Sequence, residues 1–161
     1  MIIIRRLQSG EVNLFKQLRL SSLQDAPYAF SSTYDSAVQR SAESWREQAE
    51  STTQGSDRAT FIAFSNNMPI AITALYRLDG QAGVGEVLQV WVDPEYRGMG
   101  VAWKMMDAVL EWARKNNFSR IKAGVTKVNI GAQKFYTKYG FSVLDESLMN
   151  NSEGVILMIE V

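Results

Sequence analysis

The sequence predicts an α/β (α+β) fold in which helices flank a mixed central sheet. Three observations support this prediction. Apolar and β-branched runs alternate with segments of helical periodicity along the chain. Three strand-like segments follow one another before the longest helical segment, and a strand stands on either side of that helix. Because a helical crossover joins parallel strands, we expect a mostly antiparallel sheet of about seven strands with a parallel central pair, flanked by about four helices.

The N-terminal half is predicted to contain one strand, two helices and a hairpin. Residues 2–7 include three consecutive Ile, whose β-branched side chains favour a strand. Apolar residues at helical spacing predict a first helix over residues 11–23, and a serine N-cap introduces a short second helix over residues 44–50. Two apolar runs, residues 59–64 and 70–76, flank a polar turn and predict a hairpin.

The C-terminal half is predicted to contain the crossover. A strand over residues 85–92 stops at an Asp-Pro pair, because proline cannot continue a ladder. Helical spacing of apolar residues predicts the longest helix over residues 102–115 and a shorter helix over residues 129–139, which a glycine closes. The remaining strands are predicted over residues 121–126, 141–144 and 155–161.

The composition narrows the classes of function. The 161 residues suffice for one hydrophobic core, so residues 1–161 are predicted to form a single domain. Lys plus Arg and Asp plus Glu both total 17, which favours neither nucleic acid nor an anionic membrane as a partner. The chain has no Cys and no His, which excludes thiolate nucleophiles, Cys/His zinc sites and imidazole bases. We expect no metal, and acid/base chemistry that uses carboxylates, Tyr, Lys or water.

The start of the chain is not expected to act as a targeting signal. Its apolar run is too short for a signal-peptide core and has its positive charge on the wrong side. No window approaches the ~20 apolar residues of a membrane span. We therefore expect a cytoplasmic protein.

A glycine-containing segment, residues 90–102, joins a predicted strand to the start of the longest helix. Free backbone N–H groups at a helix N-terminus attract anions, and Gly98 and Gly100 allow the backbone to approach a ligand closely. Arg97 adds a positive charge for a charge-assisted contact. The arrangement suits a pyrophosphate, although two glycines alone would also suit a plain turn between strand and helix.

Residues 97–102, Arg-Gly-Met-Gly-Val-Ala, resemble the Arg/Gln-x-x-Gly-x-Gly/Ala coenzyme A loop of the GNAT acetyltransferases. Residues 129–141 are similar to a second pattern of that family, Asn-x-x-Ala-x-x-Phe-Tyr-x-Lys-x-Gly-Phe. The resemblance is clear over residues 84–144. It implies that the two central parallel strands splay apart and that the pantetheine arm lies in the gap, bonded to the backbone of residues 90–92.

By this resemblance, the residues expected to bind coenzyme A are Val90, Trp91, Val92, Arg97, Gly98, Met99, Gly100, Val101, Ala102, Asn129, Ala132 and Tyr136. A backbone N–H near Val90 or Trp91 is expected to stabilise the developing oxyanion. Asn129 also fits the N-cap of the following helix, and the two roles are compatible.

The resemblance also implies two catalytic residues. Tyr136 is expected to protonate the departing thiolate, although a purely structural core aromatic fits the pattern too. An alkyl amine titrates near about 10.4 and must lose a proton before it attacks a thioester. Glu86 is the expected base, and strand parity places Glu86, Leu88, Val90 and Val92 on one face. The alternative is that Glu86 orders a water or pairs with a cation while the amine loses its proton through a water chain.

Two further features concern the acceptor. Gly124, in the middle of the partner strand, indicates a bulge, a close approach to a ligand or tight packing. An aromatic group falls where the family builds its acceptor pocket, and it also fits a lid that packs on the core. Its members are Tyr28, Phe30 and Tyr34.

The resemblance therefore implies an acetyl-CoA-dependent N-acetyltransferase that acts on a primary amine of a small molecule, protein or peptide. Direct attack in a ternary complex is expected, because no Cys or His is present to carry a covalent intermediate. The alternative is a non-catalytic acyl-CoA-binding or sensor domain with the same fold. The expected partners are acetyl-CoA and the amine acceptor, and a homodimer is left open.

Overall fold

The computed structural model describes residues 1–30, 32–144 and 154–161, and these residues contain a seven-stranded mixed sheet. The strands are β1 (Ile2–Arg6), β2 (Arg58–Ser65), β3 (Met68–Arg77), β4 (Val84–Val92), β5 (Arg120–Thr126), β6 (Ser142–Val143) and β7 (Gly154–Glu160). Their spatial order is β1-β2-β3-β4-β5-β7-β6. Only β4 and β5 pair in parallel, and all the other neighbours are antiparallel. The predicted sheet, mostly antiparallel with a parallel central pair, is confirmed.

Helices lie on both faces of this sheet. They are α1 (Val12–Asp25), α2 (Tyr34–Val38), α3 (Ala42–Glu50), α4 (Val101–Lys115) and α5 (Ile130–Tyr139), with the short 3-10 turns η1 (Pro27–Ala29) and η2 (Pro94–Tyr96). Each of the four predicted helices corresponds to one of these, with small differences at the ends. The sequence did not predict α2, which Thr33 begins by accepting a hydrogen bond from the Ser36 N–H. Tyr34 therefore lies in a helix and not in a loop.

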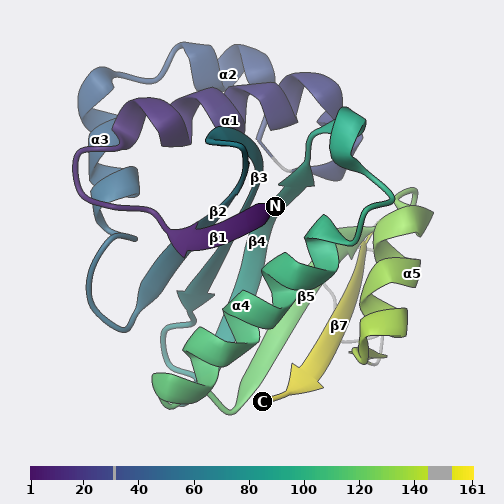
Figure 1. The fold of residues 1–161 in the computed structure, drawn as a ribbon. Coiled ribbons are helices and arrows are strands. Elements are labelled where there is room, and N and C mark those ends of the chain that lie inside the picture. The colour runs from purple at the N-terminus through teal and green to yellow at the C-terminus, as the bar shows by residue number, and fades with distance from the viewer. Residues whose placement is uncertain (31, 145–153) are drawn as a thin grey trace.

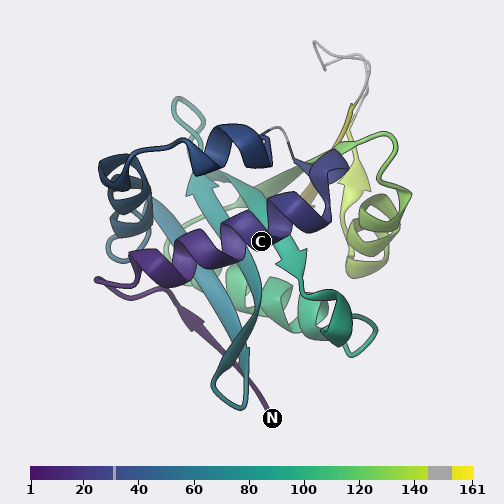
Figure 2. The same cartoon turned by 90° about the horizontal axis from the view of Figure 1, so that it is seen from above.

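Two apolar clusters cover the two faces. One packs the inner side of α4, including Met105 and Val109, against Leu75 and Val87. The other packs α1 and α3 against the opposite face; its largest members are Phe15, Trp45, Ile62, Ile72 and Trp91. Figure 1 shows α4 in front of the sheet, and Figure 2 shows α3 and α5 at opposite ends of the molecule. In the part of the chain that the structure describes, we find no helix with the length and apolarity that crossing a membrane requires.

Local signals in the sequence account for several helix ends. The Ser41 hydroxyl accepts a hydrogen bond from the Ser44 N–H at 3.1 Å, and the Asn129 side chain accepts one from the Ala132 N–H at 3.2 Å. Both are N-caps, as predicted, because a side-chain oxygen satisfies an N–H group that has no partner inside the helix. Gly140 closes α5 with φ 130°, a left-handed conformation that favours glycine.

A β-bulge interrupts β4, and the sequence did not predict it. Leu88 pairs with Ala74 and Trp91 pairs with Ile72, so three steps along β4 match two steps along β3. Within the bulge, Gln89 has φ 59°, which is uncommon for a residue other than glycine.

The bulge changes which side chains share a face, because one extra residue reverses the alternation of a strand. Before the bulge, Val87 packs in the core beneath α4, so its neighbour Glu86 faces the opposite side. After the bulge, Val90 and Val92 pack against the α4 core, whereas Trp91 joins the core beneath α1 and α3. The predicted common face for Glu86, Leu88, Val90 and Val92 is therefore wrong.

Candidate active site

The parallel pair separates halfway along its length. Residues 84–87 of β4 pair with residues 120–123 of β5, and the ladder between these two fully described strands ends there. Beyond that point β4 pairs with β3, and residues 124–126 of β5 pair with β7. The two strands diverge, as the resemblance implied (Figure 1). On its β5 side, the second half of β4 thus has main-chain groups that are not in the ladder with β5, and such groups would suit an extended ligand bound in the manner of an added strand.

The glycine loop leads from this gap to the N-terminus of α4. Gly98 and Gly100 have φ 81° and 79°, so both adopt the left-handed conformation that glycine favours. Gly100 is the N-cap of α4, and no side chain caps the helix. Backbone N–H groups in the first turn are therefore available to a phosphate group, and the helix dipole favours negative charge there.

The side chains of the loop differ in their surroundings. Met99 is 62% exposed, whereas Val101 is buried in the core and Ala102 is half-buried. At the start of α5, Ala132 is half-buried and packs against the same core. The backbone of this region, more than its side chains, is thus placed to contact a bound molecule.

An ion pair and two hydrogen bonds join α1, the end of β4 and the glycine loop. Arg97 donates to Asp25 Oδ2 at 2.6 Å and to the Val92 carbonyl at 3.0 Å. The Trp91 indole N–H donates to the same Asp25 oxygen at 2.9 Å. The hydrogen bond from Trp91, helped by the charge of Arg97, holds the pKa of Asp25 below its ordinary value. Asp25 could not be predicted from the sequence, because its partners lie 66 and 72 residues away along the chain.

Glu86 lies on the face of β4 that α1 covers, in register with Lys122 of β5 and with Tyr76 of β3. Burial raises the pKa of the Glu86 carboxyl, and the positive charge of Lys122 partly opposes this effect. A carboxyl group with a raised pKa is a stronger base when it is ionised, which suits proton transfer from an amine.

Tyr136 lies on the opposite face, in the core beneath α4 and α5. Its side chain is 5% exposed, and its ring centroid is 5.4 Å from that of Phe135 and 5.0 Å from that of Phe141. Burial raises the pKa of the phenol above its ordinary value, which keeps the hydroxyl protonated and able to donate a hydrogen bond but makes it a weaker acid. Among the described residues its hydroxyl has no hydrogen-bond partner. The position is compatible with a proton donor and with a core aromatic.

The three residues of the predicted aromatic group have different surroundings. Tyr28 is exposed, and its carbonyl accepts a hydrogen bond from the Thr126 hydroxyl at 3.2 Å. Phe30 and Tyr34 are partly buried and pack against the core beneath α1 and α3. Tyr28 thus contacts the end of β5, whereas Phe30 and Tyr34 pack on the core, an arrangement that fits both an acceptor pocket and a lid.

Gly124 faces open space on the α1 side of β5. Its pairing with β7 is regular, so it does not mark a bulge. An added Cβ would meet no atom within 4 Å, which shows that tight packing does not require glycine here. The bulge and tight-packing interpretations of Gly124 are therefore wrong, and the close approach of a ligand stays a prediction.

Gly124→Leu is expected to fold normally and to bind its ligands poorly, because the side chain would enter open space without meeting the protein. We expect the melting temperature to stay the same or rise, and kcat/KM to fall about 10- to 100-fold through displaced substrate. Gly124→Ala, which adds one methyl group, is the graded control and should retain most of the activity. Unchanged kinetics for Gly124→Leu would show that no ligand passes this position.

The structure combines a mixed sheet, a parallel pair of strands that splays apart, and a bulged strand that leads through a glycine loop to an uncapped helix. This combination is typical of a class of acyltransferases. The chain belongs to the GNAT family, because the family model described as "Acetyltransferase (GNAT) family" matches residues 20–141. This match includes both blocks on which the resemblance rested.

Solved structures share the fold over nearly the whole chain. A GNAT-family acetyltransferase from Streptococcus pneumoniae is 17% identical, with a TM-score of 0.81 over 100% of this chain and 99% of that one. The PaiA N-acetyltransferase from Thermoplasma acidophilum, solved in complex with coenzyme A, is 18% identical, with a TM-score of 0.75 and the same coverage, 100% and 99%. At these identities the likeness concerns the fold.

Curated relatives match shorter segments. The uncharacterized N-acetyltransferase YobR from Bacillus subtilis is 33% identical over 76 residues, which is 47% of this chain and 31% of YobR. The N-acetylaspartate synthetase from Xenopus tropicalis is 43% identical over 58 residues, which is 36% of this chain and 21% of the synthetase. The matched segments thus span about a third or less of the length of these two relatives.

Proposed function

We propose that residues 1–161 act as one N-acetyltransferase domain that transfers an acetyl group from acetyl-CoA to a primary amine. The observation that carries this proposal is the path from the gap between β4 and β5, through the glycine loop, to the uncapped N-terminus of α4. Support also comes from the family match, from relatives named as N-acetyltransferases, and from the coenzyme A bound to the PaiA structure.

The shape and donor groups of this path fit acetyl-CoA. In the proposed complex, the free edge of residues 90–92 would hold the pantetheine arm, and the backbone of residues 98–102 would hold the pyrophosphate. Arg97 would add charge at the loop, although its guanidinium is already bonded to Asp25 and Val92. Asn129 and Ala132 would lie beside the same ligand at the start of α5. Acetyl-CoA supplies the activated acyl group.

Side chains on the two sides of the gap would accept and donate the protons of the reaction. Glu86 would accept a proton from the amine nitrogen, either directly or through water, so that the nitrogen lone pair becomes available. Tyr136 would protonate the leaving sulfur, and the backbone N–H of Val90 or Trp91 would donate to the carbonyl oxygen as negative charge develops. Tyr28, Phe30 and Tyr34 would border the acceptor. No covalent acyl-enzyme is needed.

The first experiment measures the melting temperature with acetyl-CoA, free coenzyme A and NAD. A ligand at about 100 times its Kd stabilises a native protein by about 2.7 kcal/mol, which corresponds to a shift of about 5–10 °C for a chain of this size. We expect a shift with acetyl-CoA and coenzyme A and none with NAD. The absence of a shift at millimolar acetyl-CoA would refute the proposal.

The main alternative is a sensor or binding domain without catalysis. It predicts the same thermal shift but no release of free thiol when acetyl-CoA is mixed with a panel of amines. Thiol release that depends on the amine and produces an acetylated amine by mass spectrometry would exclude this alternative.

A further inference from the structure

Arg19 of α1 is a buried arginine for which the described part of the chain provides no acidic partner. Arg19 is 7% exposed, and it lies on the side of the sheet that carries Glu86. One guanidinium nitrogen donates to the Ser22 hydroxyl at 3.2 Å, and the guanidinium carbon lies 5.0 Å from the centroid of the Phe30 ring. Within the described residues no carboxylate lies close enough to form an ion pair with Arg19. Buried charges are normally paired, so this arrangement is costly without an anion.

Arg40 brings a second charge to the same region. Its guanidinium carbon lies 4.0 Å from the Trp45 ring centroid, and it donates to the Ser44 hydroxyl and carbonyl, both at 3.0 Å. No carboxylate among the described residues pairs with it either. Burial lowers the pKa of Arg19 to about 10; Tyr76 opposes this shift, whereas the charge of Arg40 adds to it. An anion bound near Arg19 would oppose the effect of both burial and the Arg40 charge.

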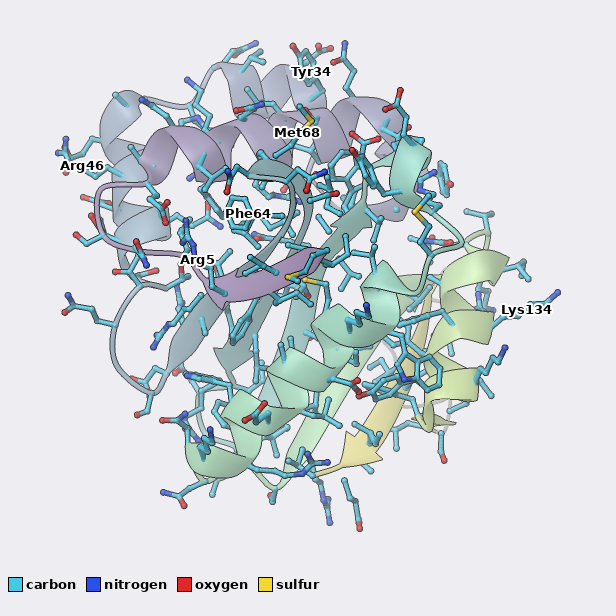
Figure 3. The ribbon with its side chains drawn as sticks, viewed as in Figure 1. Arg5, Tyr34, Arg46, Phe64, Met68 and Lys134 are labelled. Atoms are coloured by element: carbon cyan, nitrogen blue, oxygen red, sulfur yellow. The ribbon has the colours of Figure 1, made fainter. Side chains whose placement is uncertain are left out.

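Arg5 and Arg46 contrast with this pair. Figure 3 shows Arg5 near Phe64 and Arg46 at the outer side of the molecule. Arg5 stacks on Phe64 with 4.8 Å to the ring centroid, much as Arg19 stacks on Phe30, but Arg5 also pairs with Glu11 at 2.8 Å. Arg46 pairs with Glu43. Arg19 is the more buried side chain, and it is the one that lacks the carboxylate.

The position of the two arginines relates them to the proposed base. Arg19 stacks on Phe30 and Arg40 stacks on Trp45, and both rings belong to the apolar cluster beneath α1 and α3. Glu86 faces the same side of the sheet, because its neighbour Val87 packs in the cluster beneath α4. The two arginines and the proposed base therefore lie on the same face of the sheet.

We propose that the acceptor is a small amine that carries a carboxylate, as an amino acid does, and that Arg19 binds this carboxylate with Arg40 as a second positive charge. This inference rests on the proposed acetyl transfer. A planar guanidinium matches a carboxylate through two parallel hydrogen bonds, which fixes orientation as well as affinity. With the carboxylate held at Arg19, the amine would point along β4 toward Glu86 and the bulge.

The test compares free amino acids with their amides as acetyl acceptors, using thiol release at saturating acetyl-CoA. We expect the best amino acid to have kcat/KM at least about tenfold above that of its amide, because a charged hydrogen bond is lost in the amide. In Arg19→Met this preference should disappear through a higher KM for the amino acid, while the amide is unaffected. Arg19→Lys, which keeps the charge, should recover part of the preference.

Two controls separate the binding role from a structural one. Arg46→Met, which alters an exposed arginine on α3, should keep the wild-type preference. Removal of an unpaired buried charge should leave the melting temperature of Arg19→Met unchanged or raised, whereas a structural role requires it to fall. The acetyl-CoA thermal shift should persist in every variant, so its loss would implicate the proposed function and not this inference.

Three outcomes would overturn the inference. The first is an equal kcat/KM for every amino acid and its amide. The second is a preference for phosphoethanolamine over β-alanine, which would assign the anion site to a phosphate. The third is a preference for a peptide N-terminus over the corresponding free amino acid, which would assign the acceptor to a protein.

Discussion

Tyr136→Phe is expected to lower kcat by about 10²- to 10⁴-fold, the usual contribution of a positioned general acid. The thiolate would then depart without a proton from the enzyme. The ring remains, so its packing against Phe135 and Phe141 is retained, and stability should hardly change because the hydroxyl has no partner among the described residues. Single-turnover measurement of acetyl transfer checks the prediction without interference from product release.

Tyr139→Phe is the matched control on the same helix. The Tyr139 hydroxyl donates to Asp107 at 2.6 Å, so its loss should cost some stability while kcat stays near the wild-type value. If Tyr136→Phe keeps wild-type kcat, Tyr136 is a core aromatic and the thiolate is protonated by water. The two variants together thus separate catalysis from packing.

Glu86→Gln is the second substitution with a large expected effect. If Glu86 accepts the amine proton, kcat/KM should fall by about 10²- to 10⁴-fold. In the wild type, activity should also fall with decreasing pH through a pKa above the ordinary carboxyl value of 4.5, because burial raises the pKa of Glu86. The Gln variant should lose this acidic limb and keep the limb at higher pH that belongs to the amine itself.

The stability of Glu86→Gln provides an independent check on the pKa. Because the native pKa of Glu86 lies above its unfolded value, the ionised carboxyl weakens the fold as the pH rises through the native pKa. The Gln variant should therefore melt higher than the wild type near about pH 7 and at the same temperature near about pH 3. Glu111→Gln, on the exposed side of α4, should show neither effect.

A Glu86→Gln variant that loses only a few-fold in kcat/KM and keeps the acidic limb would contradict the base assignment. The amine would then lose its proton through a water chain. Raised melting near neutral pH in the same variant would still show that Glu86 is desolvated, which separates the electrostatic finding from the catalytic one.

Much of the fold could be predicted because its signals are local. Three consecutive Ile specify β1, the spacing of apolar residues specifies α4, and single side chains at Ser41 and Asn129 cap the helices that follow them. Each signal depends on residues that are close together in the sequence, so it can be recognised without knowledge of distant residues. The short helix α2 was missed because five residues carry too little periodicity to detect.

The part of the site that could be predicted also depends on local sequence signals. The glycine loop and the start of α5 are continuous segments, and the match over residues 20–141 places both within the GNAT family. The roles of the individual residues remain predictions. The face assignment on β4 failed because it assumed unbroken alternation, whereas Gln89 inserts one extra residue opposite β3.

By itself, the sequence determined the strands, the four longer helices, their order, and the loop that precedes α4. The tertiary structure alone decided that α2 forms, that β4 bulges, that Asp25 joins α1 to Trp91 and Arg97, and that Arg19 is buried with no carboxylate partner among the described residues. The physical reason is the distance along the chain over which each interaction acts. Periodicity, capping and glycine conformation act between neighbours in the chain, whereas strand pairing, burial and electrostatic pairing depend on residues that only the folded chain brings together.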